Sequence, residues 1–162
     1  MRSSKKGMDF RETRTDKILE YLCRIILAGT LVFLIAYWSR IPDQIPTHYN
    51  AAGEIDSWGG KGMIWFIVIM SWVMYLGITF VEKYPEIWNT GVKITKKNAE
   101  KVYRLLKYLI CTSKLIMVAV FCSLAVFSAL ASPLPAWWTA VYFTLLIGNA
   151  VFWLVRIIIA RK

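Results

Sequence analysis

The sequence predicts an all-α membrane protein with four transmembrane helices, and three observations support that prediction. Of the 162 residues, 57% are hydrophobic and only 19% are charged, which is below the roughly 25% charged residues of ordinary soluble domains. The apolar residues are gathered in blocks rather than spread evenly. Four of these blocks approach or exceed the length of about 20 helical residues that crosses a bilayer. A single membrane domain comprising residues 1–162 is therefore expected.

The expected spans run about 18–38, 63–81, 105–131 and 136–158. Glu20 and Arg24 lie near the start of the first span, four residues apart, so they can neutralise each other on one helix face. The basic segment 82–104 contains an amphipathic helix that leads into the third span, with Thr95 as its expected N-cap. Lys114 is expected to extend from the start of the third apolar run toward the headgroups. Only neutral polar side chains would then remain at depth, which argues against an ion-coupled transporter.

The distribution of basic residues predicts the orientation of the chain. Six Lys and Arg lie in residues 1–17, six in 82–104 and two at the extreme C-terminus, against two in 39–62 and none in 132–135. Because basic loops are retained in the cytoplasm, both termini are expected there. The protein is thus expected in the cell membrane as a multi-pass protein. Its net charge of +10 fits this retention and attraction to anionic lipid at the inner face, so nucleic-acid binding is not expected.

The outer loop 39–62, between the first two spans, holds the most distinctive pattern of residues. Its prolines restrict the backbone and its glycines permit turns, so the loop should be ordered. It contains the only histidine of the chain together with several carboxylates. The residues that stand out are Pro46, Thr47, His48, Asn50, Gly53, Glu54, Asp56, Trp58, Gly59 and Lys61.

These residues leave three interpretations open. His48, Glu54 and Asp56 could hold a divalent metal through a mixed set of nitrogen and oxygen ligands. The loop could instead form a rigid, aromatic-rimmed surface that recognises a peptide or lipid outside the cell. In a purely structural interpretation, His48 and Asn50 bond to backbone groups and Asp56 caps a turn. Lys61 would then pair with Glu54.

In this order the motif resembles a small membrane domain of unknown function, DUF1648, which opens SdpI-type immunity and signalling proteins. The segments 84–85 and 98–105 also look like single-domain members, so the resemblance covers about residues 36–108. The resemblance implies an integral membrane protein that protects against, or senses, a secreted antibacterial peptide. The peptide or another membrane protein is then an expected partner.

The expected function is therefore non-catalytic immunity or sensing, with no catalytic residue assigned. Two alternatives stay open. One is a metal-dependent membrane hydrolase in which His48 and Asp56 hold the ion and Glu54 serves as the base. The other is a structural subunit of a larger permease, which fits the small size and the lack of a polar pathway.

Overall fold

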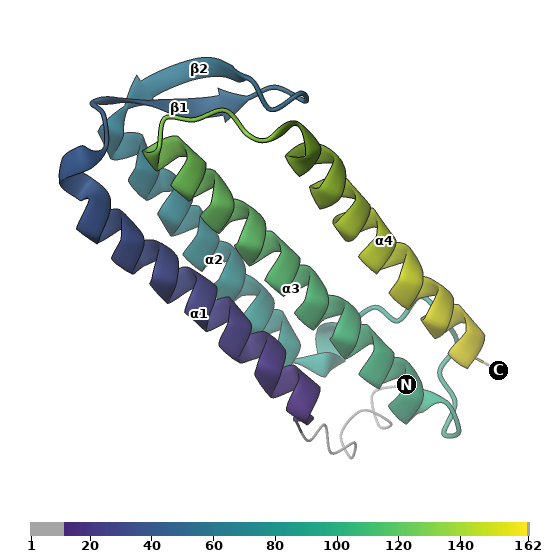
Figure 1. The fold of residues 1–162 in the computed structure, drawn as a ribbon. Coiled ribbons are helices and arrows are strands. Elements are labelled where there is room, and N and C mark those ends of the chain that lie inside the picture. The colour runs from purple at the N-terminus through teal and green to yellow at the C-terminus, as the bar shows by residue number, and fades with distance from the viewer. Residues whose placement is uncertain (1–11, 162) are drawn as a thin grey trace.

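The structure, a computed structural model, describes residues 12–161 as four long helices, the first two of which are connected through a small sheet at one end (Figure 1). The helices are α1 (Arg14–Tyr37), α2 (Ile64–Lys83), α3 (Ala99–Ala129) and α4 (Ala136–Ala160). All four are long and apolar enough to cross a membrane, so the predicted fold class is confirmed. Two boundaries matter below: α1 begins at Arg14 rather than 18, and α2 ends at Lys83 rather than 81.

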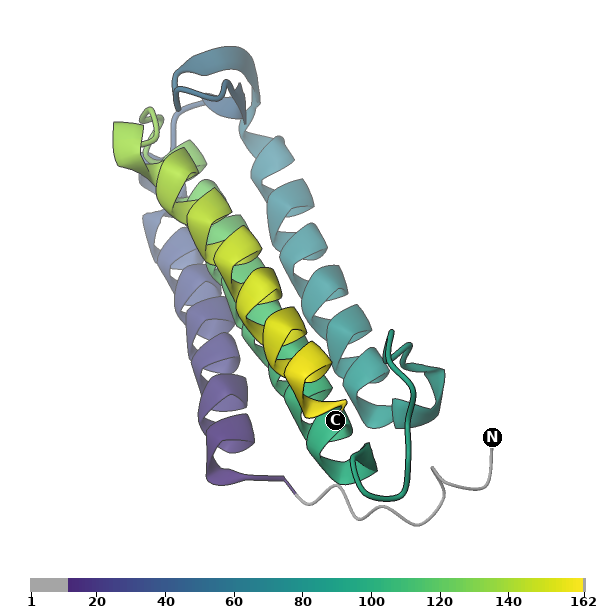
Figure 2. The same cartoon turned by 90° about the vertical axis from the view of Figure 1, so that its right-hand side faces the viewer.

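The loop between α1 and α2 is ordered, as expected, and forms a β-hairpin that the sequence analysis did not identify. Its strands, β1 (Gln44–Tyr49) and β2 (Ile55–Gly60), pair antiparallel. Short 3₁₀ turns at Trp38–Arg40 and Lys61–Met63 flank the hairpin, and a third, Pro85–Ile87, follows α2. The hairpin lies at one end of the bundle, and α1 begins and α4 ends at the other, which we call the base (Figures 1 and 2).

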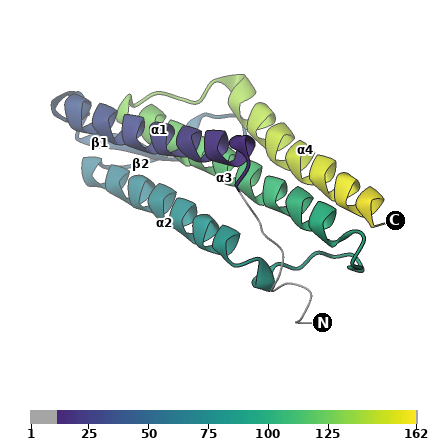
Figure 3. The ribbon, with the colours of Figure 1, turned by 90° about the horizontal axis from the view of Figure 1, so that it is seen from below.

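Helix α3 is the centre of the bundle. It packs extensively against α1, α2 and α4, whereas α1 and α2 touch each other little (Figure 3). Polar contacts help to join α4 to α3: Asn149 Nδ2 donates to Ser113 Oγ at 3.0 Å, and Trp138 Nε1 to Ser123 Oγ at 3.2 Å. Such interhelical hydrogen bonds are the contacts expected where lipid surrounds the helices.

Apolar side chains form three layers along the bundle. The layer beneath the hairpin contains Leu34, Ile41, Ile45, Ile64, Val68, Ala125 and Ala129. The middle layer contains Cys23, Leu27, Tyr75, Val118 and Cys122. The layer at the base contains Trp88, Ala99, Val102, Tyr103, Leu105, Leu106, Ile157 and Ala160. Charged side chains gather between the middle layer and the base, as described below.

The amphipathic segment runs continuously into the third span, as predicted, within one helix of 31 residues. Asn98 directly precedes the helix but makes no capping hydrogen bond to it with its side chain, and the predicted N-cap, Thr95, accepts the first backbone hydrogen bond, from Ala99 N at 3.0 Å. These two residues bond reciprocally: Thr95 N donates to Asn98 Oδ1 at 2.8 Å and Asn98 N to Thr95 Oγ1 at 3.3 Å. Thr95 and Asn98 thus form a capping box in which Thr95 has the predicted role, although the regular helix begins only at Ala99.

Candidate functional site

The hairpin is shaped by its turn, which Asn50 organises. The Asn50 Oδ1 atom accepts hydrogen bonds from the backbone N–H groups of Ala52 and Glu54, at 2.9 and 3.0 Å. Its Nδ2 atom donates to Glu54 Oε2 at 2.9 Å. Side chains that bond to nearby backbone groups in this way stabilise tight turns. The expectation that Asn50 bonds to the backbone is confirmed, and Glu54 is the partner of Asn50 rather than of Lys61.

Two glycines of the motif are required by close packing. Gly53 has a φ angle of +85°, and a Cβ atom there would lie 2.9 Å from the carbonyl oxygen of Leu134. The Leu134 N–H donates to Gly53 O at 2.8 Å, so the turn is fastened to the segment between α3 and α4. A Cβ atom at Gly59 would lie 2.7 Å from Thr47 Cγ2 on the neighbouring strand. A side chain at either position would displace its neighbour.

Replacing Gly53 with alanine is expected to destabilise the protein. The left-handed conformation alone costs a residue with a Cβ atom about 1 to 2 kcal/mol, and the clash with Leu134 adds to this. Gly62→Ala is the matched control, because a Cβ atom there has no neighbour within 4 Å. Thermal unfolding of the purified proteins in detergent measures the difference. A Gly53→Ala protein that unfolds no earlier than the Gly62→Ala protein would contradict the prediction.

His48 and Asp56 face each other across the two strands. Their Nδ1 and Oδ1 atoms are 2.6 Å apart, and 69% of the His48 side chain is exposed. Asp56 therefore holds His48 in place instead of capping a turn, and Glu54 lies with Asn50. Among residues 12–161, no three His, Cys, Asp or Glu side chains are grouped in a way that could hold a metal ion. Of the three proposed metal ligands, the structure brings His48 and Asp56 together, whereas Glu54 bonds to Asn50.

The remaining motif residues complete the hairpin. Pro46 is fully buried and Trp58 is exposed, and Thr47 Oγ1 donates to Ser57 Oγ at 3.2 Å. The Lys61 ammonium lies 4.5 Å from the centre of the Trp38 ring. The predicted pairing of Lys61 with Glu54 was therefore wrong, because Lys61 makes a cation–π contact with Trp38 and Glu54 bonds to Asn50.

Tyr49, the last residue of β1, links the hairpin to the end of α3. Its hydroxyl donates to Ser132 O at 3.3 Å and lies 3.4 Å from Ser128 Oγ. Burial raises the pKa of the Tyr49 phenol above its ordinary value, and the contact with Ser128 offsets part of that rise. The phenol therefore stays neutral at physiological pH and keeps the proton that it donates.

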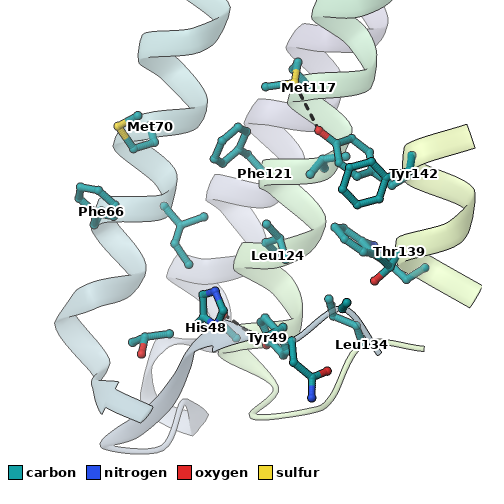
Figure 4. A pocket seen from close by; sticks show the side chains of 18 residues that line it. His48, Tyr49, Phe66, Met70, Met117, Phe121, Leu124, Leu134, Thr139 and Tyr142 are labelled. Carbon is teal, nitrogen blue, oxygen red and sulfur yellow. Dashed lines mark hydrogen bonds between the residues drawn. The ribbon is translucent and has the colours of Figure 1, made fainter. Parts of the chain in front are cut away.

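A cavity of about 640 Å³ lies between the hairpin and the helices α2, α3 and α4 (Figure 4). Its walls are mostly apolar and rich in aromatic and methionine side chains. Those lining it from the helices include Phe66, Ile67, Met70, Met117, Val120, Phe121, Leu124, Trp138, Thr139, Tyr142 and Phe143. The hairpin closes the cavity at one end with Thr47, His48 and Tyr49. Its volume lies within the range of about 300 to 1,000 Å³ that is usual for ligand pockets.

The chemistry of the cavity suits a ligand with an apolar body and a polar end. Methionine side chains adapt to ligands of varied shape, and aromatic rings provide large apolar contact areas. The Tyr142 hydroxyl, 3.6 Å from Met117 Sδ, joins two of its walls. Because Asp56 occupies Nδ1 of His48, the Nε2 atom remains as a polar group where the cavity meets the hairpin. The sequence pointed to His48 but not to the cavity, whose other walls come from distant segments.

A second site is a cluster of charged side chains between α1, α2 and α3. The Lys114 ammonium donates to Glu20 Oε2 at 2.7 Å, to Thr79 Oγ1 at 3.2 Å and also to Glu82. Only 1% of Lys114 is exposed. The prediction that Lys114 reaches for the headgroups was therefore wrong, as was the statement that only neutral polar groups lie within the spans. Half-buried carboxylates from two other helices hold this ammonium inside the bundle.

The cluster extends to neighbouring side chains. Arg24 Nε donates to Glu20 Oε1 at 2.9 Å, which confirms the predicted pair, and Tyr75 OH donates to the same oxygen. The Cys111 thiol donates to Glu82 Oε1 at 2.6 Å. One charged network thus joins three helices.

A separate ion pair lies closer to the base. Asp16 completes a capping box with Thr13 at the start of α1, and its Oδ2 atom lies 3.2 Å from Arg104 and 3.3 Å from Lys107. Lys107 belongs to the amphipathic part of α3, yet it is only 9% exposed. Asp16 draws it inward, because an unpaired buried carboxylate is costly.

Comparisons with known proteins agree with the resemblance seen in the sequence. A family model described as a domain of unknown function, DUF1648, matches residues 25–71, from α1 through the hairpin into α2. An uncharacterized protein of Archaeoglobus fulgidus is 27% identical over 85 residues, which cover 48% of this chain and 46% of that protein. The chain thus spans about half the length of this curated relative. No solved structure matches.

Proposed function

We propose, from the premise that residues 25–71 carry the DUF1648 pattern, that this membrane protein binds a secreted, membrane-active peptide without catalysing a reaction. Binding would serve immunity to the peptide or sensing of it. The observation on which the proposal depends is the apolar cavity of about 640 Å³ beneath the hairpin. An amphipathic peptide that enters the bilayer can place apolar side chains in this space.

The lining supports a peptide of variable side chains as the ligand. Met70 and Met117 face the cavity together with aromatic residues such as Phe121. Flexible methionine-rich surfaces can repack around different apolar side chains, which is how promiscuous peptide-binding proteins work. The free Nε2 atom of His48 then offers a hydrogen bond to a polar group of the peptide.

The proposal places the hairpin outside the cell. Residues 39–62 contain two Lys and Arg, whereas residues 1–17 and 82–104 contain six each. Basic segments are retained in the cytoplasm, so the base would face inward. A peptide arriving from outside would then meet the hairpin first and the cavity next.

The test has two parts. A sensitive bacterial strain that produces the protein is challenged with a panel of secreted membrane-active peptides, and survival is scored. A photoreactive benzoylphenylalanine then replaces Phe121, which lines the cavity, and cross-linking to the protective peptide is measured. Cross-linking at this position together with increased survival is the expected result.

The control for cross-linking is the same photoreactive residue at Phe152, which lies on α4, is 51% exposed and is not part of the cavity wall. Both positions are aromatic and lie in spans, and Phe152 is the more exposed of the two, so it reports cross-linking that occurs through lipid alone. Unchanged killing across the whole panel would reject the immunity version of the proposal. Equal cross-linking at the two positions would reject the cavity as the binding site.

A further inference from the structure

The charged cluster around Lys114 contains two carboxylates and two cations. Its carboxylates are Glu20 of α1 and Glu82 of α2, and its cations are Lys114 of α3 and Arg24 of α1. The charges cancel, which is required where side chains leave water. Ionisable groups inside a membrane bundle are rare and mark sites that bind protons or ions. This network therefore calls for an explanation beyond packing.

The two carboxylates differ in how many groups hold them. Glu20 accepts hydrogen bonds from Lys114, Arg24 and Tyr75. Glu82 accepts from Lys114 and from the neutral thiol of Cys111. Glu82 also lies in the last turn of α2, where the negative end of the helix dipole opposes a negative charge. Glu82 can thus lose its charge with the smaller loss of interactions.

The surroundings of Glu82 include several other titratable groups. Lys114 and Cys111 face it from α3, and Glu20 approaches from α1. Asp16 of α1 lies within electrostatic range of Cys111. The Oδ1 atom of Asp16 is buried, and within residues 12–161 it has no hydrogen-bond partner. The seam between α1 and α3 thus contains an acceptor that the present arrangement does not satisfy.

We propose that the cluster of Glu20, Glu82 and Lys114 is a proton-binding site that controls how the base-side end of α2 packs against α3. The proton comes from water at the base and binds a carboxylate oxygen of Glu82, so the net charge of the cluster rises by one. The O–H bond of the protonated carboxyl group is the only covalent bond that forms in the protein, and none breaks there. The charged bridge between Glu82 and Lys114 is then lost.

Protonation of Glu82 affects α2 selectively. Lys114 keeps its bridge to Glu20, so α1 stays attached to α3. The end of α2 retains the contact of Thr79 with Lys114 and a hydrogen bond from Trp88 Nε1 to Val81 O. Tyr75 of α2 still donates to Glu20 of α1, so the movement is confined to the end of α2 beyond Tyr75, where α1 and α2 touch little. The same helix forms one wall of the cavity near the hairpin, so its position bears on the shape of that site.

The test measures the distance between the ends of α2 and α3. Nitroxide labels are placed at Lys83→Cys and Lys101→Cys, both exposed positions, in the full chain in lipid nanodiscs. The native cysteines are at most 3% exposed, and the protein without the two substitutions serves to correct for any label on them. Pulsed electron resonance at about pH 3.5 and about pH 8 brackets the ordinary titration of carboxyl groups, which lies at about pH 4. A shift to longer distances at the lower pH is expected.

Three variants decide the assignment. Glu82→Gln mimics the protonated residue, so it should give the longer distances at both pH values. Glu20→Gln and the exposed Glu100→Gln should both keep the pH-dependent shift. The proposal is overturned if the parent protein shows no shift, if Glu82→Gln retains it, or if Glu20→Gln abolishes it. The Glu82→Gln and Glu20→Gln results are independent tests, so if one of these variants folds poorly the other still decides.

Discussion

Lys114→Met is expected to be the most destabilising single substitution in the bundle. Methionine is similar in length to lysine and apolar, so the change removes the charge while leaving little empty space. Glu82 would lose its only cationic partner among the described residues and Glu20 one of its two. Removing one partner of a buried ion pair costs about 3 to 5 kcal/mol. The measurement is equilibrium unfolding in mixed micelles, supported by the amount of folded protein in membranes.

The control and the rescue separate charge from packing. Lys101→Met alters an exposed lysine on the same helix and should change stability by less than about 0.5 kcal/mol. Combining Lys114→Met with Glu82→Gln should recover a large part of the loss, since Glu20 still has Arg24 and Tyr75. If Lys114→Met unfolds like Lys101→Met, or if the second substitution restores nothing, then the network does not contribute in the way its geometry implies.

The fold could be predicted because its signal is local. Each span is a block of apolar residues whose length matches the bilayer, and this criterion needs no knowledge of the other spans. The pair Glu20 and Arg24 was predicted for the same reason, since four residues make one turn of helix. The ends of the helices were predicted less well. Glu82 was assigned to the loop after the second span, so it was not expected to pack between helices.

The charged cluster could not be predicted, because it depends on which helix faces meet. Glu20, Glu82 and Lys114 are separated by at least 32 residues in sequence, and no spacing rule links them. Lys114 near the end of an apolar run has two solutions, snorkelling to the surface or pairing inside. Only the packing of α3 between α1 and α2 selects the second.

The hairpin was half predictable. The prolines and glycines indicated order, and Asn50 was correctly given a backbone role. The strands were missed because Pro46 and the glycines at the end of the loop are poor indicators of a strand. The cavity could not be predicted from the sequence, because its walls combine β1 with three helices that are distant in sequence.

Val120→Trp is expected to abolish peptide binding while the bundle remains folded. Val120 lies on α3 in the wall of the cavity, and an indole there would occupy space that the proposal assigns to the peptide. Because the added atoms enter an existing cavity, they need not displace packed side chains, and stability should change little. The dissociation constant for the protective peptide should rise by at least about tenfold, which corresponds to about 1.4 kcal/mol. Fluorescence titration of labelled peptide against protein in nanodiscs provides this value.

The matched control for Val120→Trp is Val151→Trp, which adds the same group to α4 at a position that is 54% exposed and outside the cavity. Both variants add the same indole to a span, so a change in binding that they share cannot be assigned to the cavity. A specific loss with Val120→Trp, at unchanged thermal stability, would show that the peptide and the indole compete for one space. If both variants bind the peptide like the parent protein, then the peptide must contact another surface, and the exposed hairpin with Trp58 becomes the next place to look.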